Sequence, residues 1–259
     1  MASGMLYSIP IAVVLLGIVL LILGSFELGF RVGEHFRTQY DKEASLSLGP
    51  MVGGVLAMLA FVLAFTFAIA AGQHDLRKQN VLREANAVGT AYLRADLLDE
   101  PQRTEVKRLL REYVDIRVQA AKGENLDFAL TRSVELHQLL WVQVLGAKTN
   151  PAPMISLVIQ SINDVIDMHE TRVTAVLHNR IPRSIWFALF VISALTMTTI
   201  GIQIGTIGKR RLIAIVPLIL AFSVLATLVV DLDRPLQGRI TTEQHAMINL
   251  QENMDRDTK

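Results

Sequence analysis

The sequence contains no cysteine and few charged residues. Without cysteine, the 259-residue chain has no disulfide, no catalytic thiol and no thiolate metal site. Only 19% of the residues are charged, and 25 basic residues nearly balance 24 acidic ones. No basic field of the kind that attracts nucleic acid is present, so we expect no nucleic-acid partner. Hydrophobic residues, by contrast, make up 51% of the chain, and a mean hydropathy of +0.40 predicts a membrane protein.

Four apolar runs are each long enough to cross a hydrocarbon core of about 30 Å. They are residues 8–30, 48–72, 185–207 and 212–230. We interpret the first run as a span and not as a signal peptide, because it is too long and no Lys or Arg precedes it. The last two runs are separated only by the turn at residues 208–211 (GKRR), which predicts an antiparallel hairpin.

Four spans place both ends of the chain on one side of the membrane, together with the long segment between the second and third spans. The Lys and Arg residues near the membrane ends are divided almost evenly between the two sides. The long segment also exceeds the length of about 60 residues within which the positive-inside rule holds. The charges therefore leave the orientation open.

Residues 73–182 are predicted to form a helical soluble domain of about four helices. Apolar residues recur there at steps of three and four. We expect the first helix to continue from the second span and the last to lead into the third. The helix over residues 126–145 is expected to turn Leu136, Leu139, Leu140 and Val144 to the core. The predicted organisation is thus two spans in 1–72, the helical domain in 73–182, a hairpin of spans in 183–230 and a tail in 231–259.

The second span has one almost smooth face. At about 100° per residue, small side chains gather in a narrow sector. They are Gly49, Gly53, Ala57, Ala60 and Ala64. Small residues let helix backbones approach closely in lipid, so this face is either a seam between helices of one chain or a contact between copies around an axis. In the second arrangement, Phe61, Phe65 and Ile69 on a neighbouring face form the apolar neck of a pore.

Polar residues form a stripe on each of the last two spans. They are Ser193, Thr196, Thr199 and Gln203 on the third span, and Ser223, Thr227 and Asp231 on the fourth. In hydrocarbon such groups need partners. Hydrogen bonds between helices are the favoured interpretation, and a solute path is the alternative.

Two carboxylates, Asp231 and Asp233, follow the fourth span in the sequence DLDRP. Hard oxygen ligands at this position suit Ca²⁺ or a monovalent cation, although Ca²⁺ takes six to eight oxygens and two carboxylates supply too few. The favoured interpretation is an ion pair with Arg234 or Arg211.

Polar residues also gather on the two helices that flank the membrane in the long segment. They are Glu84, Asn86, Arg94 and Asp96 on one helix, and Asp167 and Arg172 on the other. A buried polar network that pins the two helices is the favoured interpretation, and an acid–base active site is the alternative. The six histidines are scattered and no nucleophile or zinc motif occurs, so we expect no enzyme activity.

Three motifs resemble the bacterial DUF4239 family, which is described as a bestrophin-like domain. They are residues 84–98 (EANAVGTAYLRADLL), 166–182 (IDMHETRVTAVLHNRIP) and 231–240 (DLDRPLQGRI). With the four spans, the resemblance covers nearly the whole chain. Bestrophins are pentameric ion channels with helical cytosolic domains, in which the second span lines the pore and an apolar neck controls conduction.

The resemblance implies roles for particular residues. Phe61, Phe65 and Ile69 become the neck candidates, residues 84–96 lie on an extension of the pore helix, and Asp231 and Asp233 correspond loosely to a calcium clasp. The chain lacks the longer acidic run of animal bestrophins, which argues against calcium activation. The resemblance also implies that both termini and the helical domain lie in the cytoplasm.

We therefore predict an all-α, four-span protein of the bacterial inner membrane. It is expected to form a homo-oligomer in the bilayer, a pentamer, that conducts small ions passively through a pore lined by the second span. The alternative is a non-conducting scaffold or sensor that binds a partner through its helical domain.

Overall fold

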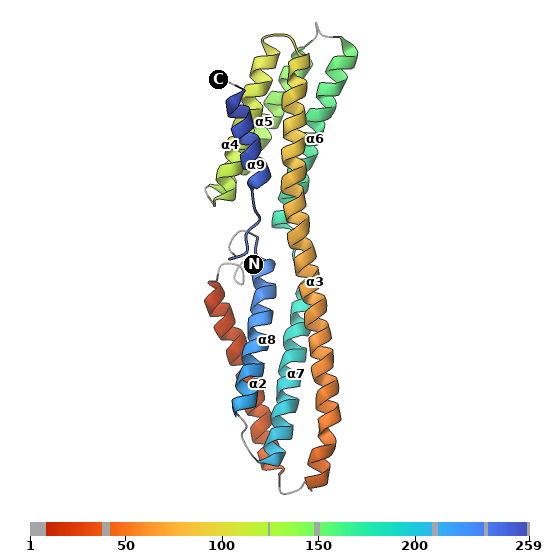
Figure 1. Cartoon of the computed structure of the whole chain (residues 1–259), viewed down its shortest axis with the longest axis vertical. Helices are drawn as coiled ribbons and strands as arrows, with labels where there is room; N and C mark the ends of the chain where they lie inside the picture. Colours follow the sequence, from red (N-terminus) through yellow and green to blue (C-terminus); the bar gives the residue numbers. More distant parts are fainter. Residues whose placement is uncertain are drawn as a thin grey trace. The chain divides into compact units, whose positions relative to one another are not determined.

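The structure, a computed structural model, describes residues 9–37, 42–123, 125–147, 151–208, 212–235 and 238–257. Every regular element in these ranges is a helix, which confirms the all-α prediction (Figure 1). The chain divides into two compact units. We call Met1–Gln73 with Arg180–Ile240 the membrane unit, and His74–Asn179 with Thr241–Lys259 the bundle unit.

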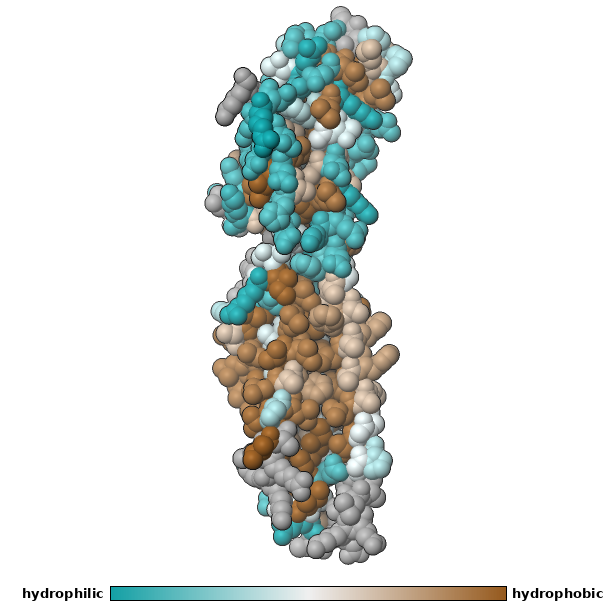
Figure 2. All heavy atoms as spheres, in the orientation of Figure 1, coloured by the Kyte–Doolittle hydropathy of each residue, from teal (hydrophilic) through white to brown (hydrophobic). Residues whose placement is uncertain are grey.

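The membrane unit contains α2 (Ile11–His35), the first part of α3 (Lys42–Arg94), α7 (Arg183–Ile207) and α8 (Leu212–Leu232). All four helices are long and apolar enough to cross a membrane, as predicted. Figure 2 shows apolar residues over most of the visible surface of α2, α7 and α8, whereas hydrophilic residues predominate over α4 and α9. The basic turn at residues 209–211 lies outside the described residues.

Glycines bring α2 and α7 into very close contact. A Cβ added at Gly29 would collide with the carbonyl group of Thr198, and one at Gly33 with that of Ile202. The reverse holds on α7, where a Cβ at Gly201 or Gly205 would collide with α2 backbone. Both helices thus carry small residues at a four-residue spacing, which lets backbones touch in lipid. The sequence analysis did not identify this seam.

The bundle unit contains the rest of α3, the short helix η1 (Ala95–Leu97), α4 (Gln102–Ala121), α5 (Leu126–Gly146), α6 (Ala152–Leu177) and α9 (His245–Arg256). Helix α3 continues from the second span, as expected. Helix α6 ends at Leu177 instead of running on into α7, and Pro182 caps α7 in an extended conformation. Proline disfavours a helical conformation in the residue before it, which accounts for the break.

The core of the bundle unit is apolar and joins all of its long helices. It includes Val88 from α3, Leu109 from α4, Leu136 from α5, Ile162 from α6 and Met247 from α9. The part of the C-terminal tail that holds α9 therefore folds as part of the bundle. One predicted core residue, Leu139, is wrong: it is 39% exposed, because it lies about 60° around α5 from Leu136, on the side away from Leu140.

Candidate functional site

The small-residue face of α3 points away from the membrane unit's own helices. Gly53, Ala57, Ala60 and Ala64 are exposed, and only Gly49 is half-buried. A Cβ added at Gly53 would meet nothing within 4 Å. The opposite face of α3 is the one that packs, as shown by the burial of Leu59 and Leu63. A seam within one chain is therefore wrong for most of this face, which is left uncovered.

The three neck candidates lie beside this uncovered face. Phe61 is 72% exposed and Phe65 is 58% exposed, while Ile69 is half-buried. Steps of four residues keep successive side chains close on one side of a helix. In a single copy of the chain, this apolar row therefore faces outward.

The hydroxyl groups of α7 and α8 find partners mainly within their own helices. Ser193 donates to the carbonyl of Leu189 at 2.7 Å, Thr196 to that of Ile192 at 2.7 Å, and Thr227 to that of Ser223 at 2.7 Å. One hydroxyl crosses between helices: Thr198 donates to the carbonyl of Ser25, at 3.2 Å, beside the glycine seam. The expected hydrogen bonds between helices are thus largely replaced by bonds within a helix.

A buried polar cluster in the bundle unit is centred on Glu84 of α3, whose side chain is fully buried. Its Oε1 atom lies 3.1 Å from Nε of Arg117 on α4 and accepts a hydrogen bond of 2.6 Å from Tyr113 on the same helix. Its Oε2 atom accepts a hydrogen bond from Arg172 on α6. Arg172 also donates to Gln244, just before α9, at 2.7 Å. One carboxylate thus holds together α3, α4, α6 and the C-terminal segment.

Two histidines extend this cluster. The hydroxyl of Tyr113 donates a hydrogen bond to Glu84. Its oxygen therefore accepts a hydrogen bond from His169, whose Nδ1 lies 3.1 Å away and carries the hydrogen. The ring of His137 on α5 packs edge-on against that of His169, with ring centroids 4.9 Å apart.

Burial and the Arg117 guanidinium lower the pKa of His137 to about 4. The same two causes, with His137 as a third, lower the pKa of His169 to about 3. Burial, followed by the charge of Glu84, raises the pKa of Tyr113 well above its usual value. At neutral pH the cluster therefore holds one carboxylate, two guanidiniums, a neutral phenol and two neutral imidazoles, an arrangement suited to fixing helices rather than to transferring protons.

The polar network predicted from the sequence is correct only at Glu84 and Arg172. Asn86 and Asp167 are exposed. Arg94 instead donates to the carbonyl of Leu157 at 3.0 Å, and Asp96 pairs with Lys107 at 2.7 Å. The sequence analysis missed Tyr113, Arg117, His169 and Gln244 as members of the Glu84 cluster. They are distant from Glu84 in the chain, and the position of a residue on its helix does not show which polar group it contacts.

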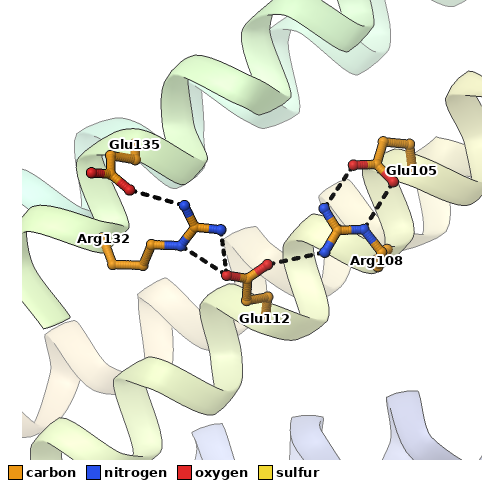
Figure 3. Close-up of polar contacts among 5 residues, drawn as sticks. All are labelled: Glu105, Arg108, Glu112, Arg132 and Glu135. Carbon is orange, nitrogen blue, oxygen red and sulfur yellow. Dashed lines mark hydrogen bonds and ion pairs between the residues drawn. The ribbon is translucent and has the colours of Figure 1, made fainter.

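A second charged network lies on the surface of α4 and α5 (Figure 3). Glu112 accepts from Arg108 at 3.1 Å and from Arg132 at 2.6 Å. Arg108 also pairs with Glu105, and Arg132 with Glu135. Glu112 thus repeats, in solvent, the arrangement of Glu84 between two guanidiniums.

A family model for the bestrophin-like domain matches residues 16–247. The chain belongs to the bestrophin-like family. The match begins within the first span and covers the other three spans and most of the bundle unit, which confirms the resemblance seen in the sequence. No curated protein and no solved structure matches the chain significantly.

The DLDRP motif of this bestrophin-like protein binds protein backbone. Asp231 accepts from the N–H groups of Arg239 at 2.9 Å and Ile240 at 3.1 Å, and Asp233 from that of Ile181 at 3.1 Å. Arg234 donates to the carbonyl of Ile9 at 2.6 Å. Among the described residues, no group of three or more potential ligands could hold a metal ion. The two carboxylates thus organise the chain around the end of α8, a use that the sequence analysis did not foresee.

Proposed function

We propose that this bestrophin-like protein is a homo-oligomeric channel, a pentamer, that conducts small ions passively. The first part of α3 from each copy lines the pore, and Phe61, Phe65 and Ile69 form its apolar neck. We further propose that it acts in the bacterial inner membrane, with its termini and bundle unit in the cytoplasm, and that it has no enzyme activity. The location and the orientation rest on the family resemblance.

The uncovered face of α3 carries this proposal. Lipid tails are as apolar as the side chains of the spans, so helices associate in a membrane through close packing. The α2 and α7 helices use their glycines for this purpose within one copy. The small-residue face of α3 has open space at Gly53, so this face is available to a second copy. Closed rotational symmetry then turns one α3 helix per copy into a lined hole.

The neck residues supply the barrier that such a hole needs. A ring of exposed phenylalanines gives a constriction that loses water readily, and an ion must shed hydration to pass it. Phe61 and Phe65 are exposed in the single chain and lie next to the small-residue face. Copies that pack through that face would bring these rings towards the axis.

The experiment combines a subunit count with ion flux. The purified protein is sized in detergent and reconstituted in liposomes, and flux is compared between the native chain and Phe65→Ala. We expect a ring of copies and several-fold faster flux in the variant, because the constriction widens. Phe187→Ala is the matched control: Phe187 of α7 is as exposed as Phe61, at 72%, but is not on α3. A monomer with no flux in any variant refutes the channel.

A non-conducting scaffold is the second candidate. The outer face of α5 favours it, because Phe128 and Val142 are each 61% exposed in the bundle unit and an apolar surface of this kind marks a binding site. An oligomer that forms normally but passes no ions in either phenylalanine variant would support the scaffold over the channel.

A further inference from the structure

The exposed face of α3 changes character where the second span ends. At about 100° per residue, side chains within about 40° of Phe61 share one sector of the helix. Up to residue 72 the exposed members of this sector are apolar or small: Ala57, Phe61, Phe65, Ala68 and Gly72. Further along α3 the sector is exposed and polar, apart from Leu93 near its end. We call these residues the polar stripe: Asp75, Gln79, Arg83, Asn86 and Thr90.

The polar stripe is not covered by the chain's own helices. The opposite side of α3, which holds Glu84, is the buried one. The C-terminal segment meets α3 beside the stripe: Lys78 pairs with Glu243 at 3.4 Å, and a Cβ added at Gly89 would lie 3.3 Å from Leu250. These two positions are about 80–100° around the helix from the centre of the stripe. The stripe itself faces whatever surrounds one copy of the chain.

Asp75 and Arg83 are the two charged residues of the polar stripe. Lys78 is neutralised by Glu243, whereas neither Asp75 nor Arg83 has a hydrogen bond or an ion pair with another residue in the described part of the chain. Their charges therefore act on the solution next to the stripe.

Distance decides which of the two charges governs the neck. At 1.5 Å per residue, Asp75 lies about 15 Å along α3 from Phe65, and Arg83 lies about 27 Å from it. The additional 12 Å or so exceeds the screening length of about 8 Å at physiological salt. Distance and screening together make the potential of Arg83 at Phe65 roughly eightfold weaker than that of Asp75. The neck is therefore exposed mainly to the negative charge.

We propose that Asp75 is the residue that selects the ion. One carboxylate per copy forms a ring at the mouth of the pore, just beyond the neck, and this ring favours monovalent cations such as K⁺ over Cl⁻. Rings of Asp or Glu are the usual means by which a pore attracts cations. The inference rests on the proposed channel and names the class of ion that it conducts.

Ion selectivity is measured on the full-length protein in planar bilayers, from the reversal potential across a KCl gradient. We expect the native channel to prefer K⁺, Asp75→Asn to lose this preference several-fold, and Asp75→Glu to keep it. Asp127→Asn is the matched control, because it removes the same charge from an exposed residue at the start of α5. A native channel that prefers Cl⁻, or an Asp75→Asn channel as selective as the native one, would overturn the proposal.

Salt separates an electrostatic role of Asp75 from a structural one. At 1 M salt the screening length falls to about 3 Å, so the selectivities of the native chain and Asp75→Asn should converge. A difference of the same size at low and high salt would show that the substitution alters the pore itself, and would refute selection by charge.

A second measurement needs no ion flux. Gly72→Cys places the only thiol of the chain about one turn before Asp75, and a Cβ at Gly72 meets nothing within 4 Å. In the detergent-solubilised oligomer, we expect a cationic thiol reagent to react several-fold faster than an anionic one, relative to their rates with a free thiol. Asp75→Asn in the same chain should remove most of this difference. An unreactive Gly72→Cys, or an unchanged ratio, would overturn the proposal.

The two measurements together separate this proposal from the proposed function. A reagent preference that depends on Asp75, without flux in any variant, supports the attraction of cations and refutes conduction. Flux whose selectivity does not depend on Asp75 supports conduction and refutes the role of Asp75.

Discussion

The two units bury polar groups in different ways. In the membrane unit, hydroxyls on α7 bond to carbonyls of their own helix, and the closest helix contact is made by glycines. In the bundle unit, a fully buried carboxylate is surrounded by two buried guanidiniums and a phenol. Among the described residues of the membrane unit, the buried charges are Asp231, Asp233 and Arg234 of the DLDRP motif, which lie at the end of α8 or just after it.

The difference follows from the solvent around each unit. In lipid, burial of an apolar side chain gains little, so contact area and backbone proximity hold helices together. In water, a large apolar core provides enough stability to accommodate a few buried charges, provided that each is paired. The same chain thus depends on shape in one unit and on charge pairing in the other.

Tryptophan fluorescence can follow each unit separately. Trp186 lies on α7 in the membrane unit, and Trp141 lies on α5 in the bundle unit; the chain has no other tryptophan. The Trp141→Phe background therefore reports the membrane unit, and the Trp186→Phe background reports the bundle unit. The predictions below use these two reporters.

Gly201→Val should have the largest effect, confined to the membrane unit. The new side chain would collide with the α2 backbone around Phe26 and Phe30, which cannot rotate aside as a side chain does. We expect destabilisation beyond the ~1–3 kcal/mol of ordinary overpacking, seen as early loss of the Trp186 signal on heating. Gly24→Val on α2 is the control, since a Cβ there meets nothing within 4 Å. Equal melting of the two variants would contradict a close seam.

Glu84→Gln should destabilise the bundle unit strongly. The change leaves the buried guanidiniums of Arg117 and Arg172 without their carboxylate. Loss of one partner of a buried ion pair costs about 3–5 kcal/mol, which urea unfolding monitored by Trp141 would measure. The Trp186 reporter should change far less. A variant as stable as the native chain would show that the cluster contributes nothing to the fold.

Acid should weaken the bundle unit more than the membrane unit. The pKa values of His137 and His169 are lowered to about 4 and about 3, whereas both groups titrate near 6.5 in the unfolded chain. The unfolded chain therefore binds more protons between these values, and stability is full above about pH 7 and falls as the pH drops below about 6.5.

Between pH 7.5 and pH 5 we expect the free energy of unfolding of the bundle unit to fall by about 2–4 kcal/mol. His169→Asn should reduce this slope, because its amide nitrogen can replace the Nδ1 donor to Tyr113 without titrating. An unchanged slope in that variant would assign the acid sensitivity to other groups.

Glu112→Gln should have the smallest effect and completes the comparison with Glu84. Both glutamates lie between two arginines, but Glu112 is on the surface, with 29% of its side chain exposed. We expect a loss of about 0.5–1 kcal/mol that shrinks in 1 M salt, because water and ions screen the pairs. A loss as large as that of Glu84→Gln would mean that burial does not decide how much such an ion pair contributes to stability.

Periodicity was sufficient to predict most of the fold. The four spans and the continuation of α3 follow from the length and spacing of the apolar residues, because a helix places every third or fourth residue on one side. Leu139 escaped this reasoning, because it lies beside the buried face of α5 and spacing does not say where that face ends. The end of α6 at Leu177 depends on the proline that follows.

The candidate sites were only partly predictable. Glu84 and Arg172 were predicted as members of a larger polar network, but the choice of Tyr113 and Arg117 as partners depends on how α4 docks. The outward direction of Gly53 and Ala57 likewise depends on which face of α3 packs. Asp231 and Asp233 were recognised as special, yet sequence alone does not distinguish a carboxylate that binds a cation from one that binds backbone N–H groups.

The close pairing of α2 with α7 has a consequence for biosynthesis. The hydrogen bond from Thr198 to Ser25 joins residues 173 positions apart. At about 5–20 residues per second, a ribosome needs roughly 10–35 s to make the intervening chain. During that interval the glycines of α2 lie in the bilayer before α7 has been made. Insertion of α2 must therefore precede its packing against α7.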